Sequence, residues 1–130
     1  MFCTSRSVVA GKDARASFGK LGEDLACDEL RRRGYRIVDR RFRTRCGELD
    51  IIARDGPDIV FIEVKTRNSQ SAVRAEQAMT PAKVNRVEQL AMAYLADREL
   101  DDLPWRIEVV TIQTDTGGLR PRISLIRDLS

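Results

Sequence analysis

The sequence predicts a single α/β domain, a mixed β-sheet flanked by helices in the order αβββαββ. Two segments have apolar residues spaced three and four apart, which is the period of a helix. Five shorter segments are rich in Val and Ile and are bounded by turn residues, which is typical of strands. A chain of 130 residues fits one hydrophobic core. Residues 1–14 have no sustained period and are expected to form a flexible tail, with residues 15–130 as the domain.

The first predicted helix begins near Ala16 and ends at the arginine triplet before Gly34. Its apolar positions, at helical spacing, are Phe18, Leu21, Leu25, Ala26 and Leu30. Glycine is suited to the left-handed conformation that ends many helices, and arginines favour the negative end of the helix dipole.

Three strands are predicted next, over residues 35–43, 47–54 and 59–67. Asp55-Gly56 followed by Pro57 is strong turn chemistry, so the second and third strands should form an antiparallel hairpin.

The remaining elements are a helix and two strands. Residues 67–79 are polar and fit either a loop or a short helix. Thr80-Pro81 is typical of a helix start, and the apolar positions that follow continue to about Asp97. Residues 104–113 and 122–129 predict the last strands.

Composition excludes several kinds of chemistry. The chain has no histidine, which rules out Ser-His-Asp and Cys-His nucleophiles and histidine-ligated metals. Three scattered cysteines argue against a disulfide framework or a structural zinc site, and fit a reducing cytosol. No apolar run is long enough to span a membrane. The expected location is therefore cytoplasmic, without a membrane partner.

Charged residues interrupt two strands that otherwise look central. Asp50 lies within the second strand, and Glu63 and Lys65 lie within the third. Because strand side chains alternate between faces, these groups would converge if the polar faces of the two strands coincide. Burying clustered carboxylates is costly unless a cation compensates them, and oxygen-only ligands suit Mg²⁺. The alternative is a solvent-facing strand with a surface ion pair of little energetic value.

These residues resemble a known nuclease signature. Asp50, followed after 12 intervening residues by Glu63-Val64-Lys65, resembles the PD-(D/E)XK motif. The blocks "GKLGEDLACDEL", "RGYRIVDRRFR", "GELDIIARDGPDIVFIEVKTR" and "QAMTPAKVNRVEQLAMAYL" resemble the YraN family of small predicted nucleases. The archaeal Holliday junction resolvases are a more distant likeness. The resemblance covers residues 15 to 128.

The resemblance implies a restriction-endonuclease-like fold and a set of roles. Asp50 and Glu63 would be metal ligands and Lys65 the catalytic lysine. Glu23 and Glu48 would be further carboxylates at the metal, which would be Mg²⁺ or Mn²⁺. Gln77 would be a polar residue supporting the ligands. The chain departs from the wider superfamily by having Leu49 where proline commonly precedes the aspartate.

Other interpretations of single residues stay open. Glu23 could instead favour the positive end of the helix dipole. Glu48 could pair with Arg45 or Arg43. Glu108 is expected to pair with Arg106 or another arginine, and Trp105 to lie in the core or at a sheet edge.

Basic residues predict a nucleic-acid surface. Residues 31–45 contain eight arginines and one acid, about +7 in a chain of net charge +3. The second helix opens with two further basic residues, near an N-terminus that can receive a phosphate. The nucleic-acid-binding candidates are Arg31, Arg32, Arg33, Arg40, Arg41, Arg43, Arg45, Lys83 and Arg86.

The functional hypothesis is a metal-dependent, structure-selective endonuclease that hydrolyses phosphodiester bonds of branched or damaged DNA. One alternative is a non-catalytic nucleic-acid-binding or adaptor module that keeps the nuclease fold. Another is a structural protein whose charged cluster contacts a partner. Resolvase-like nucleases commonly act as two-fold dimers, so a homodimer is compatible with the sequence, although no residue pattern specifies one.

Overall fold

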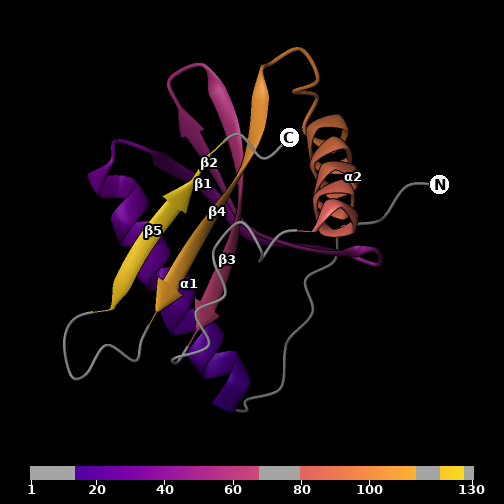
Figure 1. The fold of residues 1–130 in the computed structure, drawn as a ribbon. Helices are drawn as coiled ribbons and strands as arrows, with labels where there is room; N and C mark the ends of the chain where they lie inside the picture. Colours follow the sequence, from indigo (N-terminus) through magenta and orange to yellow (C-terminus); the bar gives the residue numbers. More distant parts are fainter. Residues whose placement is uncertain (1–13, 68–79, 114–120, 128–130) are drawn as a thin grey trace.

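The computed structural model describes residues 14–67, 80–113 and 121–127 (Figure 1). Two helices and five strands occur in this part of the chain, which confirms the predicted mixed α/β architecture. The elements are α1 (Ala14–Arg32), β1 (Arg36–Thr44), β2 (Gly47–Asp55), β3 (Asp58–Arg67), α2 (Pro81–Asp97), β4 (Trp105–Gln113) and β5 (Arg122–Ile126).

The five strands form one sheet in the order β1-β2-β3-β4-β5. Neighbouring strands are antiparallel except β3 and β4, which are parallel. Parallel strands need a long crossover connection, and α2 lies within the connection between them. The predicted hairpin is present as β2 and β3, and Gly56 at its turn has a φ of 61°. Only glycine adopts this left-handed backbone without strain.

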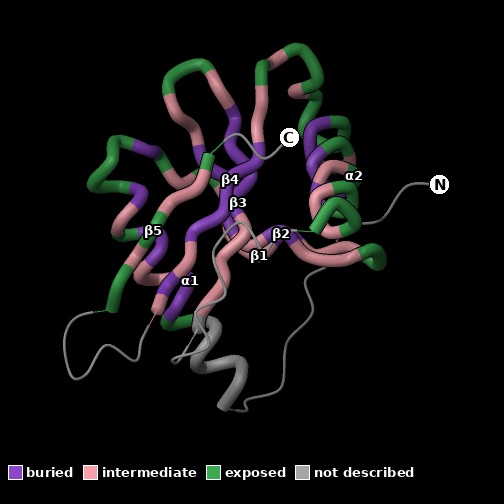
Figure 2. Tube along the Cα trace, viewed as in Figure 1, coloured by how far each residue is buried: buried purple, intermediate pink, exposed green. Residues whose placement is uncertain are grey.

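The helices cover opposite faces of the sheet, giving three layers (Figure 1). Helix α1 packs on one face through Ala26 and Leu30, against Ile51 and Ile62. Helix α2 packs on the other face, where Tyr94 contacts Phe61 and other apolar side chains. The buried residues follow the central strands and the inner faces of both helices (Figure 2). The central strands are thus covered on both sides, so polar groups within them are expensive.

Helix α1 approaches the sheet closely at one glycine. A Cβ added at Gly22 would lie 2.5 Å from the side-chain oxygen of Thr66, on β3. Real Cβ contacts do not reach this distance, so the approach requires glycine. The next residue along the helix is Glu23, which the close approach brings to the sheet.

Local sequence signals set the end of α1 and the start of α2, as predicted. Thr80 caps α2, with its side chain accepting a hydrogen bond from the backbone N–H of Lys83 at 3.2 Å. After α1, Gly34 has a φ of 94°, and the N–H of Tyr35 donates to the carbonyl of Leu30 at 3.0 Å.

A buried polar network joins three strands at the hairpin end of the sheet. Glu108, on β4, is fully buried and accepts hydrogen bonds from Arg106 Nε at 2.7 Å and Tyr35 Oη at 2.8 Å. Arg106 also binds Asp55 and Asp58, each at 2.6 Å, and so fastens the β2–β3 turn to β4. The predicted pairing of Glu108 with Arg106 is confirmed.

The predictions for Trp105 and for the cysteines have different outcomes. Trp105 is half-buried and packs against the core on the α2 side, as predicted. Cys27 is free and buried, whereas Cys46 is disulfide-bonded, which the scattered cysteines did not predict. Within the described ranges no helix is both long enough and apolar enough to cross a membrane.

Candidate active site

Three carboxylates from two elements lie close together. Glu23 comes from α1, and Glu48 and Asp50 come from β2. One carboxylate oxygen from each lies within 4.8 Å of the others. The structure therefore brings together three of the four residues predicted to bind metal.

Asp50 lies just beyond the paired part of the β2–β3 hairpin. The register of the two strands runs from Asp55 opposite Asp58 to Ile51 opposite Ile62. At the next position Asp50 Oδ2 accepts a hydrogen bond from the backbone N–H of Val64 at 2.8 Å. Asp50 is thus hydrogen-bonded to the residue that follows Glu63 on β3. This bond fixes the orientation of the Asp50 side chain beside β3.

The environment strongly favours the neutral form of this carboxyl group. Burial, followed by the negative charge of Glu63, raises the pKa of Asp50 to about 8. Glu23 and Glu48 add to the rise in the pKa, and the Val64 N–H opposes it. Among the described residues Asp50 has no cationic side chain as a partner. A bound cation would reverse this balance by favouring the ionised carboxylate.

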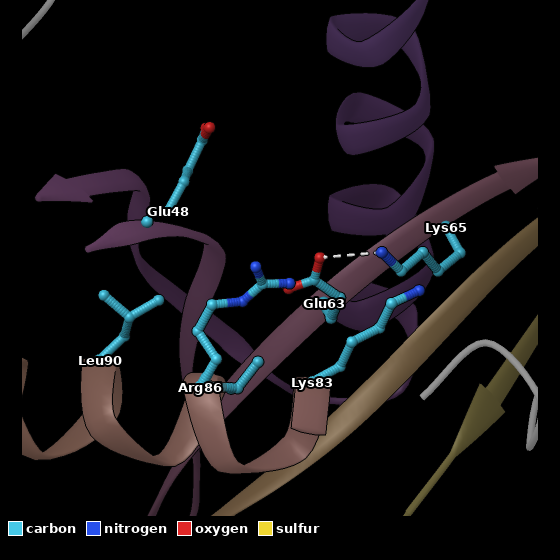
Figure 3. Close-up of a pocket in the computed structure, with 8 residues that line it drawn as sticks. Glu48, Glu63, Lys65, Lys83, Arg86 and Leu90 are labelled. Carbon is cyan, nitrogen blue, oxygen red and sulfur yellow. Dashed lines mark ion pairs between the residues drawn. The ribbon is translucent and has the colours of Figure 1, made fainter. Parts of the chain in front are cut away.

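Glu63 and Lys65 form an ion pair on the same strand. Lys65 Nζ lies 3.3 Å from Glu63 Oε1, and both side chains are half-buried (Figure 3). They line a cavity of about 150 Å³ together with Glu48 and with Lys83 and Arg86 of α2. Figure 3 shows the side chains of Lys83 and Arg86 extending from α2 toward the Glu63–Lys65 pair. Carboxylates and cations therefore face one cavity.

Two of the carboxylates already have arginine partners. Glu23 Oε1 lies 2.8 Å from Arg41 Nε and 3.5 Å from an Arg40 nitrogen. Glu48 lies 3.3 Å from Arg43, so the predicted alternative of pairing with Arg43 is confirmed. The alternative of a helix-dipole role for Glu23 is wrong, because α1 begins at Ala14 and places Glu23 in its third turn.

The pairing of Glu23 with two consecutive arginines was not predicted from the sequence. Successive strand residues normally point to opposite faces. Arg41, however, has a φ of 56°, in the left-handed region, and both Arg40 and Arg41 reach α1. The Arg40-Arg41 dipeptide is the only hint of this pairing in the sequence. It does not specify the left-handed backbone conformation of Arg41.

The predicted nucleic-acid surface is only partly assembled at the cavity. Lys83 and Arg86 line it, while the triplet Arg31, Arg32 and Arg33 lies at the end of α1, about 12–15 Å along the helix from Glu23. The triplet pairs with Asp28 and Glu29 on its own helix. The net positive charge expected from the sequence is therefore reduced by neighbouring acids.

Arg45 and Gln77 are the two remaining residues that the sequence predicted for the site. Arg45 is exposed in the turn between β1 and β2. Gln77 lies outside the described residues.

A family model and several similar proteins all indicate the same family for this chain. The model of the Uncharacterised protein family UPF0102 matches residues 22–112, which include all of the carboxylates above and Lys65. A UPF0102 protein of Geotalea uraniireducens (strain Rf4) is 43% identical over 112 residues, covering 86% of this chain and 87% of the relative. A UPF0102 protein of Mycolicibacterium vanbaalenii is 46% identical over 105 residues, covering 81% and 87%. Another, of an Arthrobacter species (strain FB24), is 40% identical over 114 residues, covering 88% and 96%. The predicted YraN-like family membership is thereby confirmed: the chain belongs to the UPF0102 family.

Proposed function

We propose that this protein is a divalent-metal-dependent endonuclease of the PD-(D/E)XK type, with a restriction-endonuclease-like core, that hydrolyses phosphodiester bonds. The observation that carries the proposal is the position of Asp50 beside Glu63, with Lys65 on the same strand 3.3 Å from Glu63. A protein that used these strands only for its core would gain stability from apolar residues here, because clustered carboxylates raise the cost of burial.

The donor set fits a hard divalent cation. All candidate ligands are carboxylate oxygens, which suits Mg²⁺ or Mn²⁺. Glu23, Glu48 and Asp50 form the cluster, and Glu63 lies beside Asp50. The raised pKa of Asp50 fits as well, because the group lacks the positive charge that would stabilise its ionised form. When bound, the cation would supply positive charge that stabilises the charge developing on the phosphate during hydrolysis.

The chain's own residues would position the reacting groups. The Val64 N–H holds Asp50 in a fixed orientation, so little reorganisation is needed on binding. Lys65 lines the cavity, where its ammonium group can donate to a phosphate oxygen or to the attacking water. Lys83 and Arg86 face the same cavity from α2 and can bind the phosphates on either side.

The substrate class that we propose is branched or damaged DNA, recognised by shape. The sequence has no helix-turn-helix or zinc-finger signature that would read base edges. Phosphate contacts from arginines give binding that is independent of sequence and sensitive to salt. Among the described residues Arg45 and Arg86 are exposed and form no ion pair, which leaves their charge for this purpose.

The test combines cleavage and binding on one set of substrates. Junction, flap, single-stranded and duplex DNA, and matched RNAs, are incubated with Mg²⁺ or Mn²⁺ and the wild-type protein. Asp50→Asn and Lys65→Met are compared with two exposed α1 controls, Asp28→Asn and Lys20→Met. We expect metal-dependent cleavage that both site variants lose and both controls keep, with binding retained throughout. Binding without cleavage under all conditions would overturn the nuclease and favour the non-catalytic module.

A further inference from the structure

A second cavity, of about 70 Å³, also lies on the α2 side of the sheet and shares no lining residue with the cavity of the candidate active site. Its lining combines two arginines, Arg36 and Arg54, with apolar and aromatic side chains that include Ile59 and Tyr94. Arg54 is four residues from Asp50 along β2, a distance of about 13 Å. Nothing in the metal cluster contributes to this cavity.

The two arginines are direct cross-strand neighbours. Arg36 of β1 is the register partner of Arg54 of β2, so their side chains leave the sheet on one face. Arg54 is in turn the partner of Ile59 on β3, whose side chain belongs to the α2-side core. Like charges placed directly opposite each other destabilise a sheet. This pair therefore needs an explanation that packing does not supply.

The protein does not neutralise the pair within its described residues. The Nε of Arg54 is buried without any hydrogen-bond partner, and neither arginine takes part in an ion pair there. The nearby acids are used elsewhere: Asp39 lies 3.2 Å from Arg98, and Asp55 lies 2.6 Å from Arg106. A buried donor left without an acceptor costs free energy, so the Nε of Arg54 would gain from an acceptor placed in the cavity.

We propose that this cavity binds a phosphate monoester. A guanidinium group is a planar fork of donors that matches the oxygens of a phosphate, and two such groups balance a dianion. The volume of about 70 Å³ is sufficient for one oxyanion group. The accessible apolar side chains of the lining, Val38 and Leu100, then lie beside the remainder of the ligand. The group can come from the end of a nucleic-acid strand or from a free phosphate compound.

The site stands independently of the proposed nuclease activity, and its test needs no cleavage. The arginine Nε–Hε resonances are followed by NMR while inorganic phosphate is titrated against chloride at matched ionic strength. We expect saturable shifts at Arg36 and Arg54 that are lost in Arg54→Gln and in Arg36→Gln. The control Arg122→Gln, which removes an exposed arginine on β5, should keep them. Shifts of equal size at all exposed arginines, or none at Arg54, would overturn the proposal.

Thermal unfolding provides a second readout and identifies the source of the phosphate. A ligand that binds only the folded protein raises its melting temperature, so phosphate should stabilise the wild type and not Arg54→Gln. A 5′-phosphorylated oligonucleotide is then compared with its 5′-hydroxyl form and with a mononucleotide. Preference for the phosphorylated strand assigns a strand end, and equal binding of the mononucleotide assigns a free compound. Stabilisation that persists in both arginine variants would contradict the site.

Discussion

The side chain of Arg41 holds Glu23 through its Nε at 2.8 Å, and Glu23 is also one of the three carboxylates that meet at the candidate metal site. A metal ion bound between Glu23 and Asp50 would therefore compete with the guanidinium for the same carboxylate. Arg40, at 3.5 Å from the same oxygen, strengthens the competition. Phosphate binding by these arginines would release Glu23 and would thereby couple substrate binding to metal binding in both directions.

The competition predicts that Arg41→Gln binds Mn²⁺ more tightly than the wild type. Removing the guanidinium leaves Glu23 without its closest partner, so the carboxylate would be free to contact the metal. Coupling between sites is typically worth about 5-fold or more, and we expect a change of that order. Titration calorimetry measures it, with Arg32→Gln as a control that breaks a pair on the exposed end of α1. Unchanged or weaker Mn²⁺ binding in Arg41→Gln would exclude competition.

The raised pKa of Asp50 predicts a stability that falls with rising pH in metal-free protein. The ordinary pKa of the group is 3.8, and the folded protein raises it to about 8, so the folded state binds the proton more tightly. Below the lower pKa both states are protonated and the stability is fully present. Between the two values the unfolded chain loses its proton first, so the free energy of unfolding falls, and it levels off above about pH 8.

Asp50→Asn should remove this dependence. We expect the variant to be more stable than the wild type at pH 8 in chelator, by an amount on the order of a few kcal/mol, and to match it near pH 4. Urea unfolding across the pH range measures the difference, with Asp28→Asn as the control on an exposed surface. Parallel curves for the wild type and Asp50→Asn would show that the carboxyl group titrates normally.

The same group predicts that metal binding releases a proton. Below about pH 8 Asp50 is largely protonated, and a cation binds the ionised form, so the affinity for Mg²⁺ should rise with pH until the pKa is passed. At pH 7 we expect nearly one proton released for each ion bound. Calorimetry in buffers of different ionisation enthalpy counts the protons directly. An affinity that does not change between pH 6 and 9 would contradict the protonated starting state.

Local sequence signals predicted most of the fold. The hairpin followed from Asp55-Gly56, and the start of α2 from Thr80-Pro81, because turn and cap chemistry acts between residues a few positions apart. The alternation of apolar and charged residues likewise placed Glu48 and Asp50 together. These signals require no knowledge of how distant segments pack.

The electrostatics of the site were less accessible from the sequence. The pairing of Glu23 with Arg41 depends on a left-handed backbone at a non-glycine residue, which no local pattern announces. Arg31 pairs with Asp28. The net charge predicted for residues 31–45 counted Arg31 in full and did not include this acid, which lies outside that range. Unpartnered groups such as Arg54 become visible only when every nearby acid has been assigned to another arginine.

The contact between Gly22 and Thr66 predicts that Gly22→Ala is destabilising, although alanine in a helix interior usually gains about 0.5–1 kcal/mol. The added Cβ would lie 2.5 Å from Thr66 Oγ1, and a β-branched side chain on a packed strand moves little. Overpacking typically costs about 1–3 kcal/mol, so the clash should win. Adding Thr66→Ala removes the obstructing atom and should restore the helix gain. Urea unfolding of both single variants and the double variant distinguishes these terms, and a stabilised Gly22→Ala would show that α1 can shift away from β3.

The buried network at the opposite end of the sheet predicts a large cost for Arg106→Met. Glu108 is fully buried, and without Arg106 its remaining partners are Tyr35 at 2.8 Å and the distant Arg127 at 3.9 Å. A buried charge that loses its partner typically costs about 3–5 kcal/mol, so the free energy of unfolding should fall by that order. Adding Glu108→Gln removes the uncompensated charge, keeps an acceptor for the Tyr35 hydroxyl, and should recover part of the loss. Arg122→Met, an exposed arginine on β5, is the matched control in urea unfolding. If Arg106→Met costs no more than this control, or if the double variant is less stable than the single one, the network does not hold the hairpin to β4.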